Sequence, residues 1–341
     1  MSESPILEVL RLGPPPWQTF DPFLFCVHHD DAYPRANANC GPDAPLTGRN
    51  IGQDFAGKDG WNMYHGDVVP GFPSHPHRGF ETITLARRGY IDHSDSLGAR
   101  ARFGRGDVQW MTAGKGIVHC EMFPLLEKDA PNPVELFQIW INLPAADKMV
   151  DPYFTMLWAH SIPRITKTDA SGKSTDITVV AGAIEGVTVP SPPPNSWAAR
   201  NEAEVAVWTV QMEPGAKVTL PLASKGVNRT LYFVTGGEVR LGGEASLKKG
   251  VAARVRPDLP LELTNGDAPS EILVLQGRPI GEPVAHYGPF VMNTREELQQ
   301  AFEDYRATRF GGWPWDRSDP IHPRDAGRFA AHANGRKEQP A

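Results

Sequence analysis

The sequence predicts an all-β protein built from two β-rich blocks, with one helix near the C-terminus. Proline and glycine are both frequent, at 33 residues each in a chain of 341, which favours turns and short elements over a helical bundle. Short runs of β-branched and aromatic residues recur between glycine turns, and this spacing is typical of a sandwich or barrel. The chain is also long enough for two domains that each have a complete core.

The first block has the most regular strand patterns. Strands are expected at residues 23–27, 80–85, 90–93, 108–112, 117–123 and 135–143, with glycine turns at 104–106 and 114–116. Residues 31–61 are rich in Pro, Gly, Asn and Asp and are expected to form a long loop. Long ordered loops of this kind often carry function.

The second block repeats the alternation of strands and turns found in the first. Its expected strands are residues 205–212, 217–220, 230–234, 239–241, 261–263 and 272–275. Because residues 144–167 are irregular and residues 190–194 are proline-rich, a domain join is expected in this region. We therefore predict an N-terminal domain at residues 1–165 and a C-terminal domain at residues 166–341, related by a weak duplication of fold.

One helix is expected at residues 295–309. Thr294 and Glu297 have the spacing of a capping box. Apolar residues then recur at helical spacing, at Leu298, Ala301, Phe302 and Tyr305. A polar tail at residues 316–341 follows the helix and is expected to be partly disordered.

Composition argues against several classes of function. The net charge of −6 disfavours direct binding to nucleic acid. Three cysteines, Cys26, Cys40 and Cys120, do not form the framework of a secreted disulfide scaffold. The N-terminus lacks the pattern of a signal peptide, and no apolar run approaches the length of a membrane span. The expected location is cytoplasmic.

Two short segments predict a metal site. His75-Pro76-His77 and His119-Cys120-Glu121 each place two ligand-type side chains two residues apart. On a β-strand, residues at this spacing point to the same face. Each segment therefore offers two candidate ligands on one face, and Cys120 points to the other face. Three imidazoles and one carboxylate suit Fe, Mn, Ni, Cu or Zn.

The residues leave some alternatives open. A single histidine in such a segment is commonly a polar residue that is satisfied by hydrogen bonds. Either Glu81 or Glu121 could supply the carboxylate, because both follow a histidine at even spacing. A triad around His93 lacks the nucleophile-elbow pattern. The second block has no His or Cys between residues 161 and 285, so it is expected to bind no metal.

The chain resembles the pirin family of bicupin proteins, whose fold is two cupin-type β-barrels in tandem. The resemblance rests on residues 75–82, 106–119 and 288–294 and extends from about residue 65 to 310. It implies that His75, His77, His119 and Glu121 bind iron, most readily as Fe(II). Glu81 takes the place of the general cupin glutamate, which makes it the second candidate ligand or a neighbour of the ligands. The loop at residues 31–61 and the tail at residues 316–341 depart from the short members of the family.

The resemblance also implies two classes of function. Some pirin-like proteins are similar to quercetin 2,3-dioxygenases, which cleave a flavonol ring with O₂ and release CO. In that case a small aromatic substrate and O₂ would meet at the metal, and Glu121 would be the base that accepts the substrate proton. Other pirins resemble redox-sensing co-regulators or partners of metabolic enzymes. A metal-bound scaffold without catalysis is the third alternative.

Overall fold

The computed structural model describes residues 3–184 and 186–340 and contains two compact units, which we treat separately. The first, here called the histidine barrel, comprises residues 27–160 and 282–340. The second, here called the aliphatic barrel, comprises residues 3–26 and 161–281. The expected two-barrel, bicupin architecture is present. The grouping differs from the predicted division at residues 165 and 166, because each terminal segment belongs to the unit formed by the other half of the chain.

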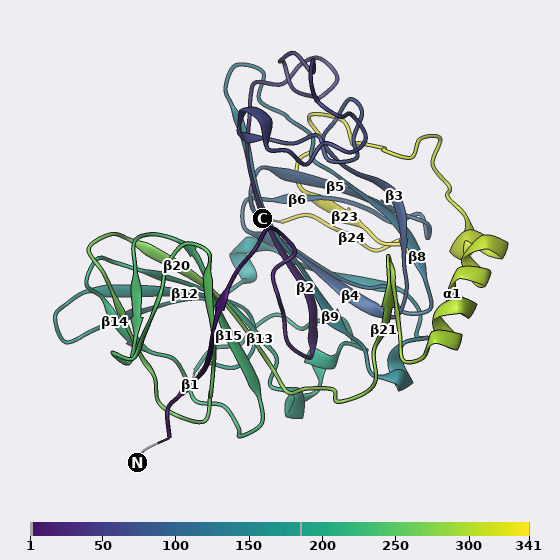
Figure 1. The fold of residues 1–341 in the computed structure, drawn as a ribbon. Coiled ribbons are helices and arrows are strands. Elements are labelled where there is room, and N and C mark those ends of the chain that lie inside the picture. The colour runs from purple at the N-terminus through teal and green to yellow at the C-terminus, as the bar shows by residue number, and fades with distance from the viewer. Residues whose placement is uncertain (1–2, 185, 341) are drawn as a thin grey trace. The chain divides into compact units, whose positions relative to one another are not determined.

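The histidine barrel is built on two sheets (Figure 1). The five-stranded sheet has the order β10-β7-β4-β9-β2 and contains β2 (Phe23–Tyr33), β4 (Phe80–Arg88), β7 (Asp107–Thr112), β9 (Asn132–Asn142) and β10 (Tyr153–Leu157). The six-stranded sheet has the order β24-β23-β6-β5-β8-β3 and contains β3 (Gly71–His77), β5 (Tyr90–Asp95), β6 (Arg100–Gly104), β8 (Ile117–Met122), β23 (Phe329–Ala331) and β24 (Lys337–Glu338). Every residue of β7 and β8 is buried, so both faces of these strands are covered.

The C-terminal segment of the chain completes the histidine barrel. A hairpin of β21 (Ala285–Tyr287) and β22 (Phe290–Met292) leads into helix α1 (Arg295–Thr308). The predicted capping box is confirmed, since the Thr294 hydroxyl accepts a hydrogen bond from the Glu297 amide and the Glu297 carboxylate accepts one from Thr294. The helix ends one residue before the predicted end, because Arg309 adopts a left-handed conformation.

Residues 316–340, the described part of the tail, make defined contacts with the barrel, whereas the sequence predicted partial disorder. The Arg102 guanidinium, which is paired with buried Asp92, donates hydrogen bonds to the carbonyl groups of His322 and Pro323. Strand β23 then adds to β6, and both strands of the tail appear in yellow beside it in Figure 1. Backbone carbonyl groups are strong hydrogen-bond acceptors. Here those of the tail accept hydrogen bonds from a buried arginine on another strand, and the composition of the tail does not reveal this contact.

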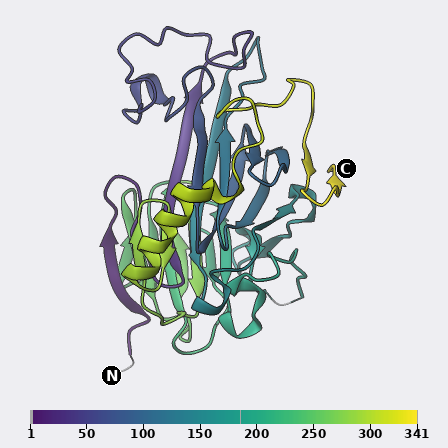
Figure 2. The same cartoon turned by 90° about the vertical axis from the view of Figure 1, so that its right-hand side faces the viewer.

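The predicted long loop runs from the end of β2 to the start of β3 and is seen at the top of Figure 2. Its only helical turn among the described residues is η1 (Lys58–Gly60). Arg49 holds the loop together: its guanidinium donates to the carboxylate of Asp54 at 2.9 Å and lies over the ring of Trp61. The other short 3-10 helices are η2 (Ala145–Asp147), η3 (Ala159–Ser161), η4 (Trp197–Ala199), η5 (Asn201–Ala203) and η6 (Arg309–Gly311).

The aliphatic barrel also has two sheets. The seven-stranded sheet has the order β1-β18-β15-β20-β13-β12-β11 and contains β1 (Ile6–Arg11), β11 (Arg164–Thr168), β12 (Ser174–Ala181), β13 (Ala206–Met212), β15 (Asn228–Thr235), β18 (Val251–Val255) and β20 (Ser270–Gly277). The four-stranded sheet has the order β14-β19-β16-β17 and contains β14 (Lys217–Thr219), β16 (Val239–Leu241), β17 (Ala245–Leu247) and β19 (Glu262–Asn265). Strand β1 pairs antiparallel with β18, which explains why the N-terminal residues belong to this unit.

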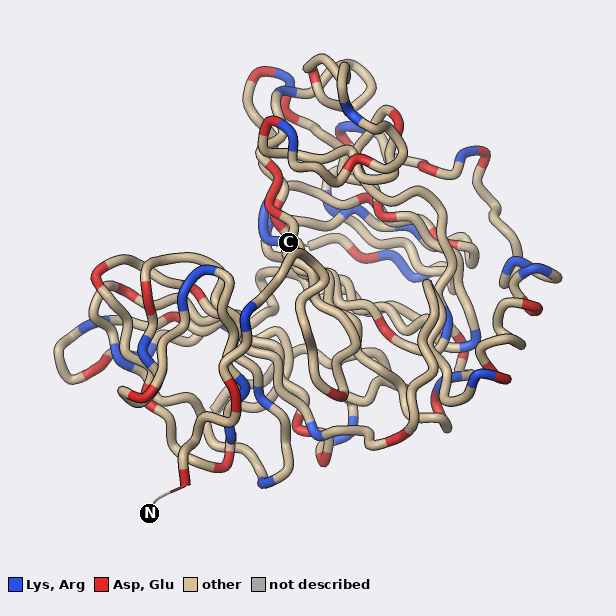
Figure 3. The backbone as a smooth tube through the Cα atoms, viewed as in Figure 1, with Lys and Arg blue, Asp and Glu red and all other residues tan. Residues whose placement is uncertain are grey.

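Acidic and basic residues are interspersed along both units (Figure 3). Within the described ranges, no helix combines the length and the apolar character that crossing a membrane requires.

Candidate metal centre

The pairing of β3 with β8 brings the two predicted metal-binding segments together. In this antiparallel pair His75 lies opposite His119, and His77 follows two residues later on the same face. The register shifts between Phe72 and His75, so that β3 contains an extra residue near Pro73. Proline cannot donate to the strand ladder and is commonly found at such bulges.

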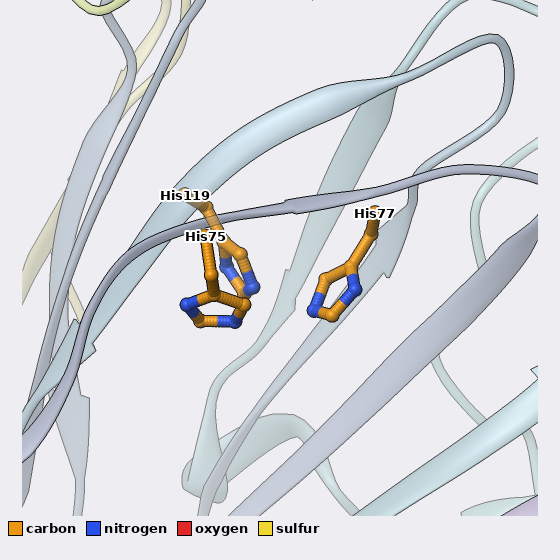
Figure 4. A group of neighbouring side chains, drawn as sticks. All are labelled: His75, His77 and His119. Carbon is orange, nitrogen blue, oxygen red and sulfur yellow. The ribbon is translucent and has the colours of Figure 1, made fainter. Parts of the chain in front are cut away.

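The three histidine side chains converge on one space (Figure 4). Their candidate ligand nitrogens all lie within 4.8 Å of one another. The ring centroids are 4.5 Å apart for His75 and His119, and 4.9 Å apart for His77 and His119. Three evenly spaced nitrogens that share one ion at about 2.1 Å can lie at most about 3.6 Å from one another, so the imidazoles would move about 1 Å closer together to hold an ion.

Burial leaves these imidazoles neutral and partly unsatisfied. Desolvation lowers the pKa of His75 to about 4 and holds the pKa values of His77 and His119 well below the usual range. Nδ1 of His77 and both ring nitrogens of His119 are buried without a hydrogen-bond partner among the described residues. Buried polar atoms usually have partners, and neutral imidazole nitrogens are good metal ligands. The donor set therefore fits a metal ion.

One ring nitrogen of His75 already forms a hydrogen bond. Its Nδ1 lies 2.8 Å from the carbonyl oxygen of Pro73. An imidazole that donates its Nδ1 hydrogen to a carbonyl presents Nε2 as the free ligand atom, and this arrangement is common around metal-binding histidines.

Glu121 lies on the same face of β8 as His119 but outside the group of three close nitrogens. Its carboxylate accepts hydrogen bonds from the Thr84 hydroxyl at 2.8 Å and from the Gln138 amide at 2.6 Å. Burial raises the pKa of Glu121, and these two hydrogen bonds oppose that rise. The carboxylate is thus held in a defined position inside the barrel by β4 and β9.

Glu81, the second candidate for the carboxylate ligand, points to the opposite face of β4 from Thr84. Its carboxylate accepts hydrogen bonds from the Thr112 hydroxyl at 2.6 Å and from the Trp110 indole at 3.3 Å. Since Thr84 contacts Glu121 and lies three residues from Glu81, the two side chains leave the strand in opposite directions. The structure therefore contradicts the interpretation of Glu81 as a ligand.

Glu81 points away from the histidines because the strand is interrupted at Gly79. This residue has a φ of 85°, and a Cβ atom there would lie 2.0 Å from the carbonyl oxygen of Val291. The left-handed conformation separates β3 from β4, so the even spacing of His77 and Glu81 no longer implies a shared face.

His93, which the sequence suggested only as a member of a triad, is a neighbour of the site. It is fully buried on β5, opposite Glu121 in the pairing of β5 with β8. Its ring centroid lies 5.5 Å from that of His119, and its Nε2 lies 3.1 Å from the Asp95 carboxylate. The alternation His93-Ser94-Asp95 is the sequence pattern that could have predicted an inward-facing His93.

Aromatic side chains surround the histidines. The rings of Phe80 and Trp140 lie 5.1 Å and 5.4 Å from that of His77, and the ring of Phe72 lies 6.4 Å from that of His75. Phe80 follows His77 by three residues in the sequence, whereas Trp140 reaches the site from β9. Trp110 belongs to the opposite face of the sheet, as its contact with Glu81 shows.

Cys120 faces away from the histidines, as predicted. It packs in a small apolar cluster with Cys40, Val69 and Met122. All three cysteines are free and buried, so they act as small apolar residues.

Comparisons with known proteins agree with this architecture. Residues 11–141 match the family model described as pirin, and residues 207–311 match the model of the pirin C-terminal cupin domain. A Pseudomonas aeruginosa protein named "Putative quercetin 2,3-dioxygenase" is 40% identical over 241 residues, which cover 70% of this chain and 79% of the relative. Human pirin is 34% identical over 261 residues, covering 74% of this chain and 81% of that protein.

A solved structure shows the same fold. The crystal structure of quercetin 2,3-dioxygenase from Acinetobacter baumannii superposes with a TM-score of 0.70 at 27% identity, covering 90% of this chain and 98% of that one. The family-model matches and these relatives lead to one conclusion: the chain belongs to the pirin family.

Proposed function

We propose that His75, His77, His119 and Glu121 hold a mononuclear Fe(II) ion and that the protein is a dioxygenase for flavonol- or catechol-type aromatic substrates. The observation that supports this most directly is the convergence of three imidazoles, of which His77 and His119 are buried, with three ring nitrogens that have no hydrogen-bond partner among the described residues. The likeness to quercetin 2,3-dioxygenases extends over most of the chain. Mn, Ni, Cu and Zn suit the same ligands, so the native metal is part of the test.

The metal would supply open positions at which a substrate oxygen and O₂ could meet. The protein would supply proton transfer and orientation. Glu121 is suited to accept the proton of a substrate hydroxyl, because it lies on the strand face of His119 and is held by Thr84 and Gln138. Those two hydrogen bonds fix the carboxylate before the substrate arrives, which lowers the cost of reaching a reactive geometry.

The aromatic wall fits a flat substrate. Phe80 and Trp140 pack together with ring centroids 4.3 Å apart, and both contact His77. Planar aromatic faces stabilise an aromatic ligand by offset or edge-to-face contacts. They would also exclude water from the space in front of the histidines.

The aliphatic barrel is proposed to bind no metal, since it contributes no His and no Cys between residues 161 and 285. We propose a cytoplasmic location, because three free cysteines fit a reducing compartment.

The first experiment combines metal analysis with O₂ uptake. Protein purified without added metal should contain close to one equivalent of iron. The iron-loaded protein should consume O₂ with quercetin and release CO. Absence of O₂ uptake across a panel of flavonols and catechols would contradict the enzymatic function. The redox-dependent binding role would then be examined by comparing the partners captured by the Fe(II) and Fe(III) forms.

A matched pair of variants tests the role of the carboxylates. Glu121→Gln keeps the shape of the side chain but removes the base, so kcat should fall by about 10²- to 10⁴-fold. Glu81→Gln should leave metal content and kcat unchanged, because Glu81 lies on the other face of β4. Loss of metal from Glu81→Gln alone would show that the proposed ligand set is wrong.

A further inference from the structure

The aliphatic barrel contains a cavity of 320 Å³ at one end of its strands. Its walls come from the end of β12, the connection from β12 to β13, and the segment after β14. Apolar residues such as Ala181, Val187 and Leu222 share these walls with the polar residues Arg200, Asn201, Glu204 and Gln276. A cavity of this size and character is within the range of small-molecule binding sites.

Trp208 gives this cavity a buried hydrogen-bond donor. The residue lies on β13 between Val179 of β12 and Val274 of β20, is only 1% exposed, and lines the cavity. Its indole Nε1 is buried and has no hydrogen-bond partner among the described residues. An unsatisfied buried donor is costly, so an acceptor that entered the cavity would be favoured.

A buried cation lies directly behind Trp208. The Arg229 guanidinium is centred 5.7 Å from the Trp208 ring, and the residue is 3% exposed. It donates to the Gln276 side chain at 2.7 Å and to the Pro221 carbonyl at 2.6 Å, both neutral acceptors. Within the described part of the chain, Arg229 forms no ion pair. A buried charge without an ion-pair partner is unfavourable.

The acidic residue at the cavity, Glu204, is close enough to favour the charged form of Arg229, although the two form no ion pair among the described residues. Glu204 lines the cavity, but its carboxylate accepts from Arg278 at 2.9 Å and from the Ser224 amide at 3.0 Å. Gln276, also in the cavity wall, donates to the backbone carbonyl of Glu204 at 3.0 Å. The single Glu204 carboxylate thus lies near two guanidinium groups, those of Arg278 and Arg229, and positive charge is in excess beside the cavity.

We propose that this cavity binds a small aromatic carboxylate. The apolar walls would enclose the ring, and one carboxylate oxygen would accept the hydrogen of Trp208 Nε1. The carboxylate charge would offset the charge of Arg229. This site is separate from the histidines and does not depend on the proposed dioxygenase function.

The test uses two fluorinated probes of similar size, 4-fluorobenzoate and 4-fluoroacetophenone, titrated by ligand-observed ¹⁹F NMR. The full-length protein should bind 4-fluorobenzoate and bind 4-fluoroacetophenone at least about tenfold more weakly, since the ketone has no charge to offset Arg229. Equal affinity for the two probes would overturn the carboxylate assignment, and no binding of either would overturn the site.

Three variants locate the binding. Trp208→Phe removes the indole donor and keeps an aromatic ring, so the affinity for 4-fluorobenzoate should fall about tenfold. Ala223→Leu, at the half-buried cavity wall, should block the probe without disturbing the core. His77→Ala should bind the probe as the parent protein does. Loss of binding in His77→Ala, with full binding in Ala223→Leu, would place the probe at the histidines and overturn the proposal.

Discussion

The two barrels use the same kind of framework for different interiors. Strand β8 of the histidine barrel is buried along its whole length and directs His119 and Glu121 inward. Strand β13 of the aliphatic barrel is buried almost throughout, and its alternate positions in the core include Trp208 and Val210. Burial therefore does not distinguish the two strands. The chemistry of a few inward positions does, which is why fold alone does not determine function.

The interiors also differ in how their polar groups are satisfied. Around the histidines, hydroxyl and amide groups on neighbouring strands hold the Glu121 carboxylate. In the aliphatic barrel the core is formed by branched side chains such as Ile177, Val179 and Ile272. A core of this second kind is stabilised mainly by area buried from water, whereas the first kind holds a cluster of imidazole nitrogens that lack hydrogen-bond partners among the described residues. The following predictions test this difference.

The largest effect is expected for His77→Ala. Removing one of three imidazoles leaves too few ligands to hold an ion tightly, so stoichiometric metal should be lost. Metal content is measured by elemental analysis of the purified protein. His160→Ala is the matched control, because His160 is exposed and lies outside the group of three. A full metal equivalent in His77→Ala would mean that the histidines are not the ligands.

Metal removal should affect the two barrels unequally. Bound metal at about 1,000 times its Kd stabilises the unit that binds it by about 4 kcal/mol. After chelation, amide hydrogen exchange should accelerate in β3 and β8, while β13 and β20 keep their protection. Equal acceleration in all four strands would show that the metal stabilises the chain as a whole rather than the histidine barrel.

A smaller effect is expected in the tail, at Arg324. Its guanidinium donates to the carbonyl groups of Leu126 at 2.6 Å and Asn37 at 2.7 Å. Arg324→Ala leaves these carbonyls unpaired and should reduce the free energy of unfolding by about 2 kcal/mol. Urea unfolding measures the change. Arg336→Ala, whose partner Glu338 lies 3.1 Å away near the surface, should change it by less than about 1 kcal/mol.

Local patterns predicted much of this structure, and their success has a physical basis. Alternation along a strand fixes which side chains share a face, so the two segments around His75 and His119 identified the three converging imidazoles. The capping box likewise located the start of α1, because the signal lies within four residues.

The parts that were missed depend on contacts between distant residues. Pairing of β1 with β18, and of β23 with β6, joins segments more than 200 residues apart, and no local pattern records it. The direction of Glu81 depends on the conformation of Gly79, which a close approach to Val291 requires. Sequence spacing assumed a continuous strand across that position.

The smallest effect concerns an ion pair of the histidine barrel. Burial alone would raise the pKa of Glu135, but its hydrogen bond with His28 and the charges of Arg87 and Arg88 lower it to about 2. Since the folded pKa lies below the ordinary value of 4.5 for a glutamate side chain, the pair stabilises the protein above that pH. The contribution is lost as the pH falls from about 4.5 towards about 2.

Glu135→Gln should therefore reduce the free energy of unfolding by about 1–2 kcal/mol at pH 7, with the difference shrinking as the pH is lowered through this range. The matched variant in the aliphatic barrel is Asp176→Asn, whose carboxylate pairs with a largely exposed Arg164 at 2.6 Å. That change should cost about 0.5 kcal/mol, because solvent screens an exposed pair. If the two variants were equally destabilised at pH 7, the partial burial of Glu135 would not strengthen its ion pairs, and the electrostatic contrast between the barrels would be wrong.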